Sequence, residues 1–179
     1  MRIIGGSLKG RLIRPPELTA RPTTDFAKEG LFNLLTNDYD FAQIKVLDLF
    51  GGSGSLSFEF ASRGCPDVTC VEINHKNASF IKKTAEQFHL TAIRVVRHNV
   101  FDFLTICTQT YHIIFADPPY DLHGLDSLPQ KIRERGLLRP HGLFVLEHSA
   151  AYDFSKTDHF VKMKKYGNVH FSFFGQPIL

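Results

Sequence analysis

Two short polar segments each follow an apolar run of the chain, and the first has the composition of a ligand-binding turn. It extends from Asp48 to Gly54 with the sequence Asp-Leu-Phe-Gly-Gly-Ser-Gly. Glycines at a strand-to-helix turn let the backbone approach a ligand closely. Glu72 follows about 20 residues later, where an acid can accept hydrogen bonds from a ribose diol. The turn and Glu72 together predict a site for a nucleoside-type cofactor.

The position of Asp48 distinguishes between nucleoside cofactors. In a dinucleotide site the third glycine of the G-x-G-x-x-G pattern would fall at position 57, which is Ser57. Asp48 lies four residues before Gly52, and a carboxylate there would repel a pyrophosphate but can bind an ammonium group. This arrangement suits the methionine end of S-adenosylmethionine. The competing interpretation is a tight turn, with Glu72 as a solvated strand end.

The second segment is Asp117-Pro118-Pro119-Tyr120, which follows the apolar run 111–116. An exocyclic amine of a nucleobase is a poor nucleophile, because its lone pair is delocalised into the ring. Asp117 and a carbonyl held rigid by the two prolines can accept the amine hydrogens and turn the lone pair toward a methyl donor. Tyr120 can stack on the base, which must be flipped out or unpaired. The competing interpretation is a rigid turn.

The elements that position these segments follow from hydrophobic spacing. Short apolar runs alternate with helical stretches, which predicts an α/β fold: a mostly parallel seven-stranded sheet with helices on both faces and an antiparallel hairpin at its C-terminal end. Asn74 and Thr23 or Thr24 are expected N-caps, and Gly64 and Gly136 expected helix ends. Strands are expected at 44–50, 68–73, 92–96, 111–116, 142–148, 160–166 and 169–174, helices at 24–35, 55–63, 74–88 and 128–135, and a small N-terminal hairpin at 3–4 and 12–13.

Length and composition predict one cytoplasmic domain without a membrane anchor. The 179 residues are 43% hydrophobic and 22% charged, close to globular averages. We expect a single domain over 1–179, with an extension at 1–40 and a catalytic core at 41–179, acting as a monomer. No apolar run is long enough to span a membrane, and the three cysteines and nine histidines show no metal-ligand spacing, so no metal is expected.

Basic residues concentrate near the N-terminus, although the formal net charge is only +3. We expect Lys9, Arg11, Arg14 and Arg21 to contact RNA phosphates, an interaction that weakens steeply with salt. The competing interpretation is a solvated hairpin face.

These motifs together resemble one known family, the bacterial small-subunit (16S) ribosomal RNA guanine-N2 methyltransferases, which are Rossmann-like class I enzymes. The resemblance covers nearly the whole chain and includes the segments 2–11, 21–33 and 166–173 besides the two turns. It implies transfer of a methyl group from S-adenosylmethionine to the N2 amine of a guanine in 16S rRNA, within an assembling small ribosomal subunit.

The resemblance also implies roles for individual residues. Asn99 stands where the family commonly has Asp, Phe26 replaces a customary Arg, and Gly30 stands where helix formers are usual. These departures bear on the adenine contact and on RNA contacts rather than on the chemistry. The implied cofactor residues are Asp48, Gly52 and Gly54 at the methionine end, Glu72 at the ribose, and Asn99 and Val100 at the adenine, with Phe50 and Ile73 as further cofactor contacts; Asp117, Pro118, Pro119 and Tyr120 are the implied catalytic residues.

Two other functions compete with this one. An adenine-N6 DNA methyltransferase uses the same Asp-Pro-Pro-Tyr chemistry, but it usually needs a separate target-recognition region for which this chain has little room. A catalytically silent RNA-binding assembly factor would retain the fold, but the presence of Asp48, Glu72 and Asp117 argues against it.

Overall fold

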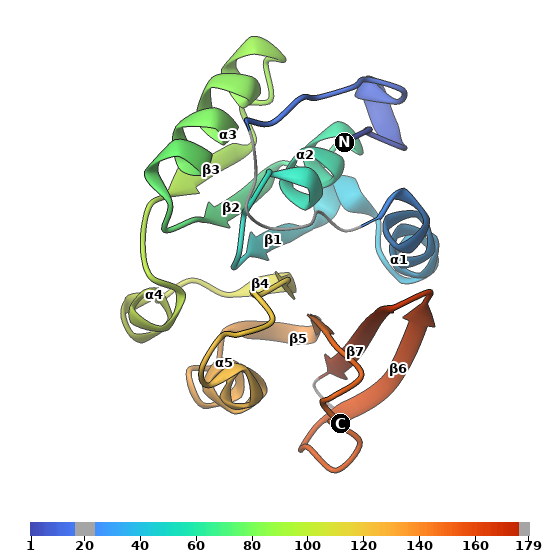
Figure 1. Cartoon of the computed structure of the whole chain (residues 1–179), viewed down its shortest axis with the longest axis vertical. Coiled ribbons are helices and arrows are strands. Elements are labelled where there is room, and N and C mark those ends of the chain that lie inside the picture. The colour runs from blue at the N-terminus through green and yellow to red at the C-terminus, as the bar shows by residue number, and fades with distance from the viewer. Residues whose placement is uncertain (17–23, 176–179) are drawn as a thin grey trace.

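The computed structural model describes residues 1–16 and 24–175, and their strands form one mixed sheet. The strand order is β3-β2-β1-β4-β5-β7-β6 (Figure 1). The five strands β1 to β5 pair in parallel, whereas β7 runs antiparallel to β5 and to β6. The predicted sheet is thereby confirmed. The strands are β1 (Lys45–Asp48), β2 (Asp67–Val71), β3 (Ile93–Val96), β4 (Tyr111–Ala116), β5 (Leu138–His148), β6 (Phe160–Tyr166) and β7 (Val169–Gly175).

Helices cover both faces of the sheet, as expected. Figure 1 shows α1, α2 and α3 on one face and α4 and α5 on the other. Three short 3-10 helices lie in the connections, at Gly6–Leu8, Phe41–Gln43 and Leu125–Ser127. The α-helices are α1 (Asp25–Asp38), α2 (Ser55–Ser62), α3 (His75–Gln87), α4 (Val100–Ile106) and α5 (Leu128–Glu134).

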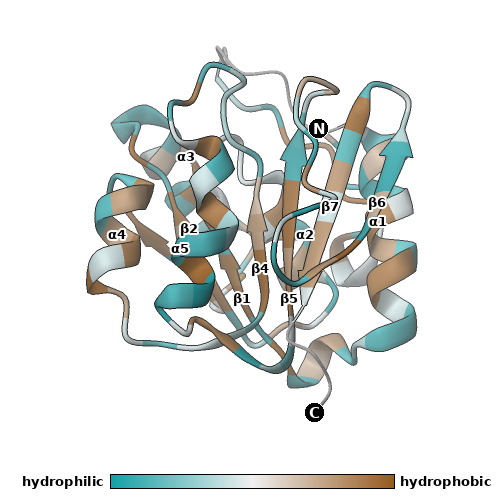
Figure 2. Ribbon diagram, turned by 90° about the horizontal axis from the view of Figure 1, so that it is seen from below, coloured by the Kyte–Doolittle hydropathy of each residue, from teal (hydrophilic) through white to brown (hydrophobic). Residues whose placement is uncertain are grey.

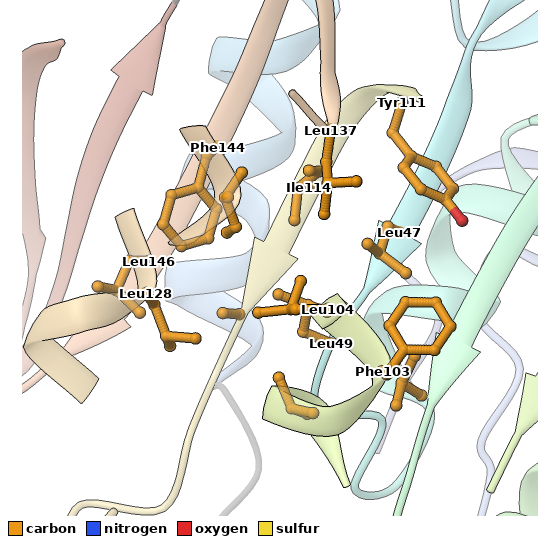
Figure 3. Packing of buried hydrophobic residues seen from close by; sticks show 14 of the residues in the cluster. Leu47, Leu49, Phe103, Leu104, Tyr111, Ile114, Leu128, Leu137, Phe144 and Leu146 are labelled. Atoms are coloured by element: carbon orange, nitrogen blue, oxygen red, sulfur yellow. The ribbon is translucent and has the colours of Figure 1, made fainter. Parts of the chain in front are cut away.

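The core consists of two apolar layers, one on each side of the sheet. Successive strand side chains point to opposite faces, so Val46 packs with α1 and α2 while Leu47 packs with α4 and α5. Figure 3 shows part of the second layer, where Leu47 of β1 and Leu49, just after this strand, lie near Phe103 and Leu104 of α4. Hydrophobic residues accordingly concentrate on the central strands in Figure 2.

The helix ends confirm the predicted capping residues. The Thr24 hydroxyl accepts from the backbone N–H of Ala27, and the Asn74 carboxamide accepts from two N–H groups at the start of α3. Gly64 and Gly136 follow α2 and α5 with φ of 93° and 61°, a left-handed conformation that glycine adopts without strain.

The larger differences from the prediction concern two helices, one strand and the N-terminal hairpin. Helix α4 was not predicted, and α1 continues to Asp38 rather than ending at 35. Strand β5 begins at Leu138 rather than 142, because a register irregularity accommodates Pro140. The N-terminal hairpin is reduced to a single bridge, Arg2 with Leu12. The division into an extension at 1–40 and a core at 41–179 stays a prediction.

A buried ionic cluster fastens the N-terminal segment to helices α1 and α2. Lys28 of α1 and Glu59 of α2 are 1% and 0% exposed, with 3.5 Å between Nζ and Oε2. Arg63 Nε donates to the other Glu59 oxygen at 2.9 Å. Glu59 also accepts from the Ile4 N–H at 3.0 Å, and Lys28 donates to the Arg2 carbonyl at 2.5 Å. The first residues of the chain are therefore held by charges inside the protein.

Candidate functional site

The sheet topology brings the two predicted segments together. Strands β1 and β4 are neighbours and run parallel, so their carboxyl ends, at Asp48 and Asp117, lie at the same sheet edge. Glu72 follows β2, the neighbour of β1 on the other side. The strand order reverses between β1 and β4, and ligands of open α/β sheets bind at such switch points.

The glycine-rich turn after β1 places backbone close to this edge. Gly52 and Gly54 have φ of 53° and 79°, which side-chain-bearing residues rarely adopt. A Cβ on Gly54 would lie 2.6 Å from the Phe58 ring, so this glycine is also required by packing. At Gly52, by contrast, the nearest atom to a Cβ would be the Phe50 carbonyl oxygen at 3.9 Å. Gly52 thus leaves its backbone open to a ligand.

Glu72 connects the glycine-rich turn to the start of α3. Its Oε2 accepts from the Gly52 N–H at 2.6 Å, and its Oε1 accepts from the Asn74 N–H at 2.7 Å. These two bonds fix the orientation of the carboxylate. An ionised carboxylate offers about four lone-pair sites, so Glu72 retains acceptor capacity for a diol.

Asp48 is a buried carboxyl group at the end of β1. It is 2% exposed, and its Oδ2 accepts from the Ser57 hydroxyl at 2.7 Å. Burial raises the pKa of Asp48 to about 6, and the nearby charge of Glu72 acts in the same direction, whereas the bond from Ser57 lowers it. Such a group is stabilised in its ionised form by an adjacent cation.

The other residues expected to bind the cofactor differ in exposure and in hydrogen-bond partners. Ile73 is exposed, whereas Val100 is buried and Phe50 packs against the same core layer. The Asn99 oxygen, which we expected to accept from adenine, accepts instead from the N–H groups of Phe101 and Asp102 at the start of α4. The adenine contact of Asn99 stays a prediction.

The Asp-Pro-Pro-Tyr segment leaves the sheet in a tight turn. Pro118 is buried, and the Pro119 carbonyl accepts from the Leu122 N–H at 3.0 Å. The Asp117 side chain is partly exposed, and Tyr120 is 62% exposed. The segment therefore presents a carboxylate and an aromatic ring at the edge where the glycine-rich turn lies.

One acidic residue at this edge has no counterpart among the predicted site residues. Glu147 is the penultimate residue of β5 and is 4% exposed. The sequence does contain a signal for this residue: Glu147 directly follows the apolar run 143–146, Leu-Phe-Val-Leu, and so stands at the carboxyl end of an expected strand.

The N-terminal cations are partly described. Lys9, Arg11 and Arg14 are exposed, and the Arg11 guanidinium lies 5.6 Å from the centre of the Phe88 ring. Arg21 lies outside the described residues. These positions leave the three described cations available to a polyanion.

Phe26 and Gly30, the two residues of α1 that differ from the family pattern, lie against the same aromatic ring. Phe26 is exposed and meets the Tyr166 ring edge-on, with 5.8 Å between centroids. A Cβ on Gly30 would lie 2.1 Å from the same Tyr166 ring. The absence of a side chain at Gly30 therefore lets Tyr166 pack directly on the helix.

Residues 1–16 and 24–175 contain neither a cluster of metal ligands nor a membrane-spanning helix. Within these ranges no three His, Cys, Asp or Glu side chains gather to hold a metal ion. Within the same part of the chain no helix is long and apolar enough to cross a membrane.

The chain is similar to one family of known proteins over most of its length. The family model described as Conserved hypothetical protein 95 matches residues 1–175. The chain is 34% identical over 127 residues to "Ribosomal RNA small subunit methyltransferase D" of Buchnera aphidicola subsp. Baizongia pistaciae, covering 71% of this chain and 64% of that relative, slightly less than two thirds of its length. It is 33% identical over 148 residues to the Escherichia coli K12 protein of the same name, covering 82% and 74%.

A solved structure extends the similarity to the fold. The Escherichia coli protein yhhF, named a putative methyltransferase, superposes with a TM-score of 0.86 at 29% identity. The match covers 98% of this chain and 97% of that one. The predicted Rossmann-like methyltransferase fold is confirmed.

Proposed function

Because the chain belongs to the family described as Conserved hypothetical protein 95, whose curated relatives include small-subunit rRNA methyltransferases, we propose that it methylates the N2 amine of a guanine in 16S rRNA. The methyl donor in this proposal is S-adenosylmethionine, and the substrate is the assembling small ribosomal subunit. The proposal includes a monomeric, cytoplasmic enzyme that needs no metal.

The observation that carries the proposal is the set of carboxylates at adjacent strand ends. Asp48 and Glu72 flank the open backbone of Gly52, which suits an ammonium group on one side and a ribose diol on the other. When bound there, S-adenosylmethionine supplies an electrophilic methyl group on a sulfonium. Ile73, which is exposed, offers apolar surface to the cofactor.

Asp117 positions the acceptor amine. Its carboxylate and a carbonyl of the Pro118-Pro119 turn accept the two N2 hydrogens, which directs the lone pair at the methyl carbon. With S-adenosylmethionine bound, the methyl group would pass from sulfur to N2 as the C–S bond breaks, and the displaced N2 proton would pass to the Asp117 carboxylate that accepts it. Tyr120 is exposed and can stack on the flipped base.

The proposal is tested by supplying labelled S-adenosylmethionine with three substrates: immature small subunits, naked 16S rRNA and duplex DNA. We expect label in N2-methylguanosine of the particle or the rRNA. Label in DNA adenine would overturn the substrate assignment. No label anywhere, with no cofactor binding, would favour a silent assembly factor.

Cofactor binding should depend on pH through Asp48. Its pKa in the folded protein is about 6, above the ordinary value of 3.8, so the carboxyl is neutral below pH 6 and loses its attraction for the ammonium group. We expect the affinity for S-adenosylmethionine to fall about tenfold between pH 7.5 and pH 5. The same raised pKa makes the unliganded protein less stable as pH rises from 3.8 to 6.

Calorimetric titration at several pH values checks this expectation. Asp48→Asn should bind weakly with no inflection near pH 6. Ser57→Ala removes the hydrogen bond that lowers the Asp48 pKa, so its inflection should move to higher pH. An inflection that persists in Asp48→Asn would assign the pH dependence to another group.

RNA binding should depend on the N-terminal cations. Replacing Lys9, Arg11 and Arg14 together by alanine should weaken binding of 16S rRNA and flatten its salt dependence, because each phosphate contact contributes roughly 0.7 to 0.9 to the slope of log K against log salt. Filter binding between 50 and 300 mM salt measures the slope, with a loss of about 2 expected. Lys131→Ala, on α5, is the control. Equal slopes in the triple variant and the wild type would show that these cations do not contact phosphates.

A further inference from the structure

We propose that Glu147 is a specificity-determining residue that accepts the N1–H of the target guanine beside Asp117, so that the site accepts guanine and rejects adenine. The inference rests on the proposed function and names the group that selects its base. It concerns a side chain at the same sheet edge as the glycine-rich turn.

The sheet register places Glu147 next to Asp117. Ala116 of β4 pairs with Leu146 of β5, so the following residues of both strands, Asp117 and Glu147, are adjacent at the carboxyl edge. The backbone of Glu147 is also fixed on its other side by pairing with Phe171 of β7. Glu147 is therefore held by β7 on one side, and on the other side it lies beside Asp117, one residue beyond the last pair of β4 with β5.

Both carboxylates belong to the same face of the sheet. Directly paired residues share a face, and Phe171 belongs to the core layer that packs against α1 and α2. Phe115, two residues before Asp117, belongs to the same layer. The alternation of strand side chains thus assigns Asp117 and Glu147 to one side, above the Phe115 and Phe171 rings, whose centroids are 6.0 Å apart.

The environment of Glu147 strengthens hydrogen bonds to a ligand. The residue is 4% exposed, and it lies next to the paired rings of Phe115 and Phe171, so little water reaches it. Hydrogen bonds to a charged acceptor gain strength in such surroundings. An ionised carboxylate offers about four lone-pair sites, so Glu147 can accept from a base in addition to its contacts within the protein.

Two adjacent carboxylates distinguish guanine from adenine by hydrogen-bond polarity. Guanine carries N1–H and N2–H donors next to each other, so Asp117 can accept from N2 while Glu147 accepts from N1. Adenine has a lone pair at N1, which would face the Glu147 carboxylate and repel it. A site built to bond one partner rejects an analogue that leaves its polar groups unpaired.

The test uses Glu147→Gln, whose side chain has nearly the same size but can donate to the N1 lone pair of adenine. Once the modified nucleotide is mapped, small subunits are prepared with guanine or adenine at that position. The rates of N2-methylguanosine and N6-methyladenosine formation are then measured for both proteins. We expect Glu147→Gln to methylate the guanine substrate about 10 to 100 times more slowly than wild type, with the ratio of adenine to guanine rates raised at least about tenfold.

Controls separate base selection from a purely structural role. Affinity for S-adenosylmethionine should match that of wild type, because Asp48 and Glu72 keep their own partners, Ser57 and Gly52, in this variant. Gln130→Ala, at an exposed position on α5, should leave both rates unchanged. A structural defect would slow both substrates alike and leave the rate ratio unchanged.

The outcomes also distinguish this inference from the proposed function. If the wild type forms no N2-methylguanosine, the proposed function fails. If the wild type does form it and Glu147→Gln keeps the wild-type ratio of rates, only the role of Glu147 is overturned.

Discussion

Asp117→Ala should lose methyl transfer by about 10²- to 10⁴-fold while binding S-adenosylmethionine with wild-type affinity. The expected loss follows from the role of Asp117, because alanine can neither hold the N2 amine nor direct its lone pair. The cofactor residues Asp48 and Glu72 lie on other strands and keep their own partners, Ser57 and Gly52. Single-turnover rates and calorimetric titration measure the two quantities separately.

Asp117→Asn is the matched control for this experiment. Its carboxamide oxygen can still accept one amine hydrogen, although without charge, so the expected rate lies between those of Asp117→Ala and wild type. An alanine variant as active as wild type would contradict the proposed role of Asp117 in positioning the amine. Loss of cofactor affinity together with activity would assign Asp117 to the cofactor site instead.

Glu59→Ala should be among the most destabilising single substitutions in the chain. It removes the carboxylate that faces both Lys28 and Arg63 and leaves the Lys28 ammonium in a buried position without this counter-charge. Removing one partner of a buried ion pair typically costs about 3 to 5 kcal/mol. Burial already lowers the pKa of Lys28 against the opposing effect of Glu59, so the variant should neutralise this lysine more readily.

Thermal and urea unfolding measure the effect of Glu59→Ala. At roughly 2 to 4 °C per kcal/mol for a domain of this size, the melting temperature should fall by about 6 to 20 °C. Glu134→Ala is the control, because Glu134 is exposed on α5 and bonds only Gln130 among the contacts described for it. A melting temperature within 2 °C of wild type would mean that the cluster does not hold the N-terminal segment.

Local chemistry made much of the fold predictable from the sequence. Thr24, Asn74 and Gly136 mark helix ends through their own side chains or their own conformational freedom, so short segments suffice to identify them. The β4 strand is apolar apart from His112 and is followed by Asp117 and two prolines, and its observed bounds equal the predicted ones. The parallel sheet then follows from the alternation of such strands with helices.

Other features depend on partners distant in the sequence. The seven-residue helix α4 was not predicted, because the sequence interpretation gave the Asn99 side chain to a ligand, whereas in the structure it caps this helix. Gly30 is explained only by the ring of Tyr166, more than one hundred residues away.

The candidate site shows the same division between local and distant information. The turns at Gly52 and Asp117 are local sequence patterns, so both could be predicted from the sequence alone. Glu147 is a single acid after an apolar run. It becomes a candidate site residue only because the pairing of β4 with β5 places it beside Asp117. The role of every site residue stays a prediction until variants are assayed.

Nucleoside mapping of 16S rRNA from cells with and without this protein tests the central claim most directly. The account predicts that one N2-methylguanosine present in the parent is absent when the protein is removed, and that it returns when wild-type protein but not Asp117→Ala is supplied. An unchanged set of N2-methylguanosines in 16S rRNA would contradict it.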